Sequence, residues 1–124
     1  MQFLLLVYTD DDLLSKLPAP SFDEHMRSCL QHADELKEAG RLIEFQQLEP
    51  AKTARSVRVR GGRTTVLDGP FAETKEMLAG FNLIDAESIE EAVRMAQAFP
   101  WTRYGCIEVR PVRDVAAVRA RVGA

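Results

Sequence analysis

The chain has 124 residues, a hydrophobic fraction of 46%, a charged fraction of 28% and a formal net charge of −3. This length and composition predict one globular domain with a substantial core, and they exclude a disordered chain. The acidic balance, with a pI near 5.4, argues against a protein that binds nucleic acid by neutralising phosphates. No stretch approaches the ~20 apolar residues that span a bilayer. We therefore expect neither nucleic acid nor a membrane as a partner.

The two cysteines, Cys29 and Cys106, are too few for a disulfide framework. The apolar residues 3–7 lack a preceding basic region and are followed closely by acidic residues, unlike a secretory signal. We therefore expect a cytoplasmic protein with reduced thiols.

The first half of the chain is expected to fold as strand, helix and strand. Residues 2–8 form a short apolar run, which is typical of a buried strand. After a proline-containing loop, Ser21 and Glu24 have the spacing of a capping box, so we expect a helix from Ser21 to Gly40. Its apolar residues recur on one face. Residues 41–48 predict the second strand.

The second half is expected to open with a β-hairpin. Valines alternate with arginines before Gly61-Gly62, a turn that tolerates positive φ, and residues 64–67 return along it. Residues 78–84 predict a strand in which Gly80 marks a bulge or a close approach of another backbone. The remaining elements are a helix with a capping box from Ser88 to Glu91, a strand over residues 105–110 and a short terminal helix.

This order predicts an α+β fold of the ferredoxin-like, split-βαβ type with an inserted β-hairpin. We expect residues 1–112 to form one domain and residues 113–124 a C-terminal tail. Both helices would cover one face of a four-stranded antiparallel sheet and leave the other face open. An apolar open face needs a cover, so we expect a homodimer. The candidates for that face are Leu4 or Leu5, Leu83 or Ile84, and Ile107 or Val109.

The nonapeptide Asp68-Gly69-Pro70-Phe71-Ala72-Glu73-Thr74-Lys75-Glu76 is too short and too polar to be a core element. Together with the opening strand over residues 3–8, Leu48-Glu49-Pro50 and the closing residues 107–112, it resembles the YCII-related superfamily, specifically the DGPF-domain group. The resemblance covers nearly the whole chain. It implies a dimeric α+β barrel, in which two ferredoxin-like sheets pack face to face and each has a cleft between sheet and helices.

The resemblance implies little about activity. The wider superfamily includes small-molecule enzymes with a proposed histidine–aspartate pair, and DGPF proteins are often encoded beside sigma factors of the extracytoplasmic-function type. In the YCII type the histidine lies 11 residues before the glycine that closes the first helix, and Cys29 occupies that position here. A simple histidine–aspartate mechanism therefore does not carry over directly.

Cys29 and His32 are candidate catalytic residues on the first helix. Spacings of four and seven residues bring His25, Cys29 and His32 to nearly the same face. Such a set can bind zinc, but no fourth ligand is evident, so we predict no metal site. Cys29 is either a nucleophile activated by His32 or a small buried core residue.

Asp68 is the third catalytic candidate. An aspartate before Gly-Pro can hold its own turn by hydrogen bonding to the following backbone. A carboxylate fixed in this way can also orient His32 or act as a base. The two roles are compatible.

Four further residues are candidates for ligand binding. Phe71 is expected to anchor its turn in the core. Lys75 offers a cation to an acidic ligand, unless it belongs to a solvated charged patch. Arg58 on the hairpin is a possible anion contact, and Tyr8 at the end of the first strand is a possible hydrogen-bond donor in the same cleft.

These residues predict a ligand cleft between the first helix and the sheet, roofed by residues 68–76 and lined by Tyr8, Cys29, His32 and Asp68. If the protein is an enzyme, acid–base chemistry of the isomerase, lyase or hydrolase type on a small organic molecule suits these groups. No nucleotide or flavin motif is present, and no cofactor is expected. The alternative is a non-catalytic ligand-binding or regulatory protein linked to a sigma factor. Convergence of polar groups on one cavity favours the enzyme, and an apolar cavity favours the binding protein.

Overall fold

The structure is a computed structural model that describes residues 1–124. Its elements in chain order are β1 (Gln2–Asp10), α1 (Asp11–Ser15), α2 (Ala19–Glu38), β2 (Leu42–Gln47), the 3₁₀ turn η1 (Ala51–Thr53), β3 (Arg55–Arg60), β4 (Arg63–Asp68), β5 (Glu76–Asp85), α3 (Ile89–Gln97), the 3₁₀ turn η2 (Pro100–Arg103), β6 (Gly105–Pro111) and α4 (Val115–Val122).

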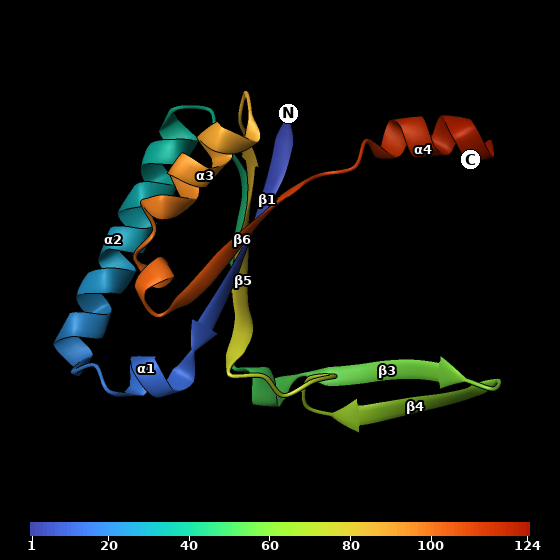
Figure 1. Ribbon diagram of the computed structural model, residues 1–124, viewed down its shortest axis with the longest axis horizontal. Helices are drawn as coiled ribbons and strands as arrows, with labels where there is room; N and C mark the ends of the chain where they lie inside the picture. The colour runs from blue at the N-terminus through green and yellow to red at the C-terminus, as the bar shows by residue number, and fades with distance from the viewer.

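The main sheet has four antiparallel strands in the order β2-β5-β1-β6, and β3 pairs with β4 in a separate two-stranded sheet. This order confirms the predicted ferredoxin-like α+β fold. Figure 1 shows α2 and α3 on one side of the main sheet, whereas the β3–β4 hairpin and α4 project on the other side. No helix combines the length and the apolar content needed to cross a membrane.

Alternation along β1 builds the core beneath the helices. Phe3, Leu5 and Val7 are buried on the side that faces α2 and α3. Cys29 and Ala33 are buried on α2, and their small size lets the helix approach the sheet closely. Burial of each large side chain, such as Phe3 or Leu5, contributes about 1.5–3 kcal/mol to folding.

The opposite face of the main sheet is apolar along its two central strands. In antiparallel pairs, residues directly opposite each other share a face. The register therefore places six apolar side chains on this open face: Leu4, Leu6 and Tyr8 of β1, and Leu78, Phe81 and Leu83 of β5.

The edge strand β6 corrects one prediction about the open face. Ile107 and Val109 pair with Val7 and Leu5, so they face the helices and pack against the core. The open face of β6 instead carries Cys106, Glu108 and Arg110, which pair with residues on the open side of β1.

The start of α2 differs from its prediction. The helix begins at Ala19 after Pro18, so Ser21 lies inside it and does not cap it. Prolines at the start of a helix lose no intrahelical hydrogen bond and have a suitable φ, which moves the boundary forward. The predicted end is confirmed, because α2 ends at Glu38 and Gly40 follows with a φ of +73°.

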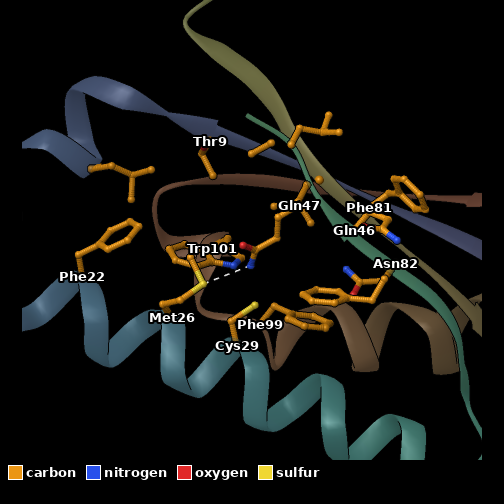
Figure 2. Close-up of a pocket in the computed structure, with 16 residues that line it drawn as sticks. Thr9, Phe22, Met26, Cys29, Gln46, Gln47, Phe81, Asn82, Phe99 and Trp101 are labelled. Atoms are coloured by element: carbon orange, nitrogen blue, oxygen red, sulfur yellow. Dashed lines mark hydrogen bonds between the residues drawn. The ribbon is translucent and has the colours of Figure 1, made fainter. Parts of the chain in front are cut away.

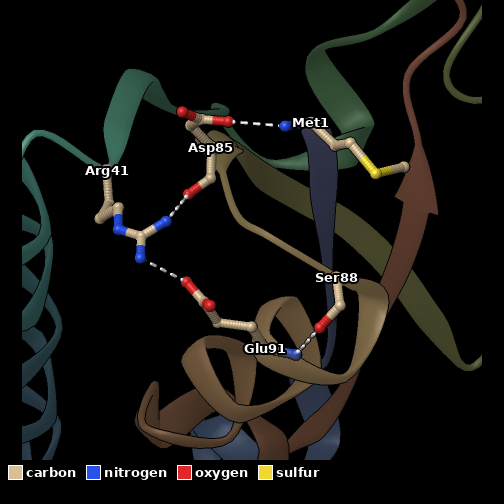
Figure 3. A network of polar contacts seen from close by, with 5 residues as sticks. All are labelled: Met1, Arg41, Asp85, Ser88 and Glu91. Carbon is tan, nitrogen blue, oxygen red and sulfur yellow. Dashed lines mark hydrogen bonds and ion pairs between the residues drawn. The ribbon is translucent and has the colours of Figure 1, made fainter.

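A polar network at one end of the sheet joins β1, β5, β2 and α3 (Figure 3). The amino group of Met1 lies 2.9 Å from Asp85 Oδ1. Arg41 donates a hydrogen bond to the Asp85 carbonyl at 3.2 Å and forms an ion pair with Glu91 Oε1 at 2.8 Å. Ser88 caps α3 as predicted by accepting the Glu91 N–H. The Glu91 carboxylate completes no capping box, because it pairs with Arg41. The hydrogen bond from the Met1 amino group holds the pKa of Asp85 below its usual value.

Two glycines permit close approach between neighbouring strands. A Cβ atom on Gly80 would lie 2.7 Å from the carbonyl oxygen of Gln46, and one on Gly105 would collide with that of Tyr8. The register of β1 and β5 also shifts by one residue between Val7 and Tyr8, opposite Gly80. The prediction of a bulge or a close approach at Gly80 is confirmed on both counts.

The hairpin of residues 55–68, here called the arm, extends away from the body of the protein (Figure 1). Its turn is the predicted Gly61-Gly62, with φ of +56° and +76°. Ser56 is half-buried, and every other residue of β3 and β4 is exposed. At the root, the Gly69 N–H donates to the Ala54 carbonyl at 2.7 Å. A hydrogen bond between the two flanking residues therefore closes the arm at its root, and the arm is otherwise exposed in the single chain.

Candidate functional site

A cavity of about 180 Å³ lies between α2 and the helix-facing side of the sheet (Figure 2). Eleven of its 16 lining residues are hydrophobic, and the lining contains no charged side chain. The volume resembles that of an engineered apolar cavity of about 150 Å³ that holds benzene. The cavity thus has room for one small molecule.

Helix α2 forms one wall because Phe22, Met26 and Cys29 recur at helical spacing on its inner side. The facing wall comes from the sheet and η2, which contributes Trp101. The rings of Phe22 and Trp101 pack with centroids 5.8 Å apart. Phe99, just before η2, also lines the cavity.

Four residues with polar side chains interrupt this apolar lining: Thr9 on β1, Gln46 and Gln47 on β2, and Asn82 on β5. Gln47 Nε2 donates to Met26 Sδ at 3.2 Å and so connects β2 to α2 across the cavity (Figure 2). Asn82 is only 1% exposed, and its Oδ1 has no hydrogen-bond partner.

Cys29 lines the cavity as a buried thiol. Burial raises its pKa, and a hydrogen bond with the Trp101 side chain only partly opposes the shift. A raised pKa keeps the sulfur in the neutral form, which is neither a good nucleophile nor a metal ligand. Its surroundings are therefore those of a packed core cysteine.

The two histidines that flank Cys29 have other partners. His32 Nε2–H donates to the Met95 carbonyl at 3.0 Å, and its ring packs edge-on against Phe99 with centroids 4.4 Å apart. His25 Nε2 shares a hydrogen bond of 2.8 Å with the Tyr104 hydroxyl. Neither histidine lines the cavity. His32 links α2 to α3, and the proton on Nε2 is committed to that link.

Asp68 and Arg58 lie on the arm. The Asp68 side chain is 89% exposed and pairs across the hairpin with Arg55 Nε at 3.1 Å. It makes no hydrogen bond to its own turn, contrary to the expectation; its partner is this cross-strand guanidinium. Arg58 is exposed on β3. The arm projects from the side of the sheet opposite α2 (Figure 1), so Asp68 does not meet His32 or Cys29 within one chain.

Tyr8 and Phe71 border a different and larger hollow of about 640 Å³ between the root of the arm and the start of β5. Phe71 is 76% exposed, so the expectation that it anchors its turn in the core is wrong. Lys75 Nζ lies 3.8 Å from the buried carboxylate of Asp10, which also caps α1. Within one chain, Lys75 thus has a structural partner.

Of the four residues expected to line the cleft, only Cys29 does so. The residues that sequence reasoning missed are aromatic, Phe45, Phe99 and Trp101, together with the amide of Asn82. A signal for Asn82 was present, since it is the one polar residue in the apolar run from Leu78 to Ile84. Asparagine is depleted in strands, so its place there calls for a partner.

The fold and the cavity define a class: a small α+β domain of ferredoxin-like topology, with an apolar cavity under its first long helix and an unpaired arm. The chain belongs to the YCII-related domain family, which matches residues 1–116. It is also similar to the "Uncharacterized protein R00369" of Rhizobium meliloti (strain 1021). The two are 39% identical over 116 residues, covering 90% of this chain and 92% of the relative.

Proposed function

We propose that this YCII-related protein is a non-catalytic binding protein, and that a small neutral molecule occupies the cavity between α2 and the sheet. The observation that carries the proposal is the lining itself, which is mainly apolar and has no charged side chain. Buried apolar pockets with a few polar groups are the usual form of small-molecule sites. Acid–base chemistry by Asp68 and His32 lacks this support, because Asp68 is exposed on the arm and pairs with Arg55, whereas His32 bonds to the Met95 carbonyl on α3.

A matched pair of cysteine variants tests the binding proposal. Leucine at position 29 in Cys29→Leu adds bulk to the cavity wall, and Cys106→Leu makes the same change outside the cavity. Toluene and cyclohexanol should raise the melting temperature of the wild type and of Cys106→Leu and shift the emission of Trp101, the single tryptophan. Cys29→Leu should lose both effects. The proposal fails if neither molecule binds the wild type, or if Cys29→Leu binds as well as Cys106→Leu.

We also propose that the protein forms a homodimer through the open face of the sheet. Six apolar side chains lie along the middle of that face. The arm carries four more exposed ones: Val57, Val59, Val66 and Leu67. An isolated two-stranded hairpin is marginal in water, so the arm needs a surface to pack on. Figure 1 supports a second copy as that surface, because the arm and α4 project beyond opposite ends of the open face and bracket it.

Sedimentation tests the dimer. The wild type should sediment at micromolar concentration as a species of twice the chain mass of 13.9 kDa. Leu6→Glu, at the centre of the open face opposite Phe81, should sediment as a monomer, because a carboxylate cannot be buried unpaired. Ile89→Glu is the control, since Ile89 is an exposed apolar residue on α3. A monomeric wild type would overturn the dimer.

Three narrower points belong to the same proposal. Placement in the DGPF-domain group rests on Asp68-Gly69-Pro70-Phe71. Residence in the cytoplasm rests on two thiols that are both free. A regulatory link to a sigma factor rests on the family resemblance, and co-purification of a sigma factor with wild type but not with Leu6→Glu or an arm variant would support it.

A further inference from the structure

The side chain of Asn82 is a buried polar group for which the chain supplies neither a hydrogen bond nor an ion pair at Oδ1. It sits in the centre of β5, directly opposite Leu5 on β1 and Phe45 on β2. It is 1% exposed, and Oδ1 has no partner. Buried polar groups nearly always have hydrogen bonds, because leaving one unpaired costs its full desolvation. An amide in this position therefore calls for a partner that the chain itself does not supply.

The cavity beside Asn82 has room for such a hydrogen-bonding partner. Asn82 lines it, and Gly80, two residues earlier on the same side of β5, has no side chain to fill the space. One water occupies about 30 Å³ of liquid, so a cavity of about 180 Å³ is larger than a single water requires. Aromatic side chains share the cavity with the amide: Phe45 pairs with Asn82 in the sheet, and Phe99 and Trp101 also line the cavity (Figure 2).

The chemistry of the lining restricts the partner. A primary amide offers a carbonyl acceptor and an N–H donor side by side. The complementary group has an adjacent donor and acceptor in one plane, as in a lactam or a cis amide. An ionised ligand would lose its hydration without meeting an opposite charge, because no charged side chain lines the cavity. Flat rings, by contrast, pack well against aromatic walls.

We propose that the cavity selects a small, planar, neutral molecule with a lactam or cis-amide edge, held by two hydrogen bonds to the Asn82 amide with its ring against Phe99 and Trp101. This inference rests on the proposed binding function and adds the chemical class of the ligand. Asn82 is the residue that determines specificity, and the aromatic residues supply the space and most of the apolar contact.

Three probe molecules of similar size test the class. 2-Pyridone has the lactam edge, N-methyl-2-pyridone keeps the acceptor but lacks the donor, and toluene has neither. Titrations followed by Trp101 emission and by calorimetry should show 2-pyridone binding about tenfold or more tightly than N-methyl-2-pyridone. Equal affinities for these two would overturn the assignment of the edge.

The variant Asn82→Leu distinguishes the contribution of the amide to affinity from that of the cavity space. This variant should lose about tenfold or more in affinity for 2-pyridone and keep its affinity for toluene within about threefold. If leucine blocks toluene as well, Asn82→Ala, which leaves more space, makes the same comparison. An undiminished affinity for 2-pyridone in Asn82→Ala would overturn the inference while leaving the binding function intact.

The stability of Asn82→Leu gives an independent readout. Replacing an unpaired buried amide with an apolar side chain of similar size should leave the melting temperature of the free protein unchanged or raise it. A clear fall would show that the amide already has a partner in the free protein, and would also overturn the inference. Failure of toluene and of both pyridones to bind the wild type would instead refute the proposed function itself.

Discussion

Strands of equal length pack against the core in the body but are exposed in the arm. β2, β3 and β4 each have six residues. β2 joins a four-stranded sheet, and Phe45 on its inner side packs against the buried core. β3 and β4 pair only with each other, and their valines stay exposed. The chain thus forms strands in both regions, but only a covering layer makes a strand part of a core.

Two phenylalanines show this difference in burial most clearly. Phe99 is 1% exposed and contacts His32 and the cavity, whereas Phe71 is exposed near the root of the arm. We expect Phe99→Ala to lower the free energy of unfolding by about 3–5 kcal/mol. Phe71→Ala should change it by less than about 0.5 kcal/mol at protein concentrations too low for association. Urea denaturation at matched dilution measures both. Similar losses for the two variants would mean that Phe71 is covered within the single chain.

A second test uses the closest backbone contact in the body. Gly105→Ala should destabilise the fold by about 2–3 kcal/mol, because the new Cβ would collide with the Tyr8 carbonyl and push β6 away from β1. The matched change in the arm is Arg63→Ala at an exposed position of β4, which should be nearly neutral. Hydrogen exchange should locate the loss of protection in β1 and β6. A neutral Gly105→Ala would contradict the close packing of these strands.

Two serines with the same sequence signal provide the third test. Both Ser21 and Ser88 precede a glutamate at capping-box spacing, but only Ser88 caps a helix. Ser88→Ala should cost about 1 kcal/mol, and Ser21→Ala should be neutral or slightly stabilising because alanine favours a helix interior. Thermal unfolding of the two variants measures the difference. Equal losses would place the start of α2 at Ser21.

The smallest expected effect concerns an exposed carboxylate of the body. Because the pKa of Asp85 is lowered in the folded state, its carboxylate stabilises the fold above its unfolded pKa of about 3.9. This contribution is lost as the pH falls through the lower folded value. Asp85→Asn should therefore be slightly less stable than wild type at pH 7 and match it in strong acid. A stability deficit that does not shrink on acidification would contradict the pairing with the Met1 amino group.

The fold could be predicted because its signals are local. The β-α-β order, the Gly61-Gly62 turn and the glycine after α2 follow from periodicity and from residues with special backbone preferences. The start of α2 was misplaced because Ser21 and Glu24 imitate a cap, while Pro18 and the residues after it already favour a helix. The proline signal and the capping-box signal favour different start points, and the helix begins at the one that comes first in the chain.

The site was harder to predict because its residues meet only in three dimensions. Cys29 was found on the helix, but Phe45 and Trp101 lie far from it in the sequence and look like ordinary core residues. Asp68 and His32 form a candidate pair on chemical grounds alone. The sequence does not show that the hairpin leaves the sheet on the far side, and that geometry separates them.

The root of the arm has a consequence for how such a protein can change over time. Ala54 and Gly69 are joined by a hydrogen bond of 2.7 Å, so the chain leaves the body and returns to it at almost the same point. The 14 intervening residues behave as a cassette inserted between two fixed ends. Lengthening, trimming or replacing that cassette does not require the core to be repacked. The arm and the lining of the cavity can therefore change independently of each other.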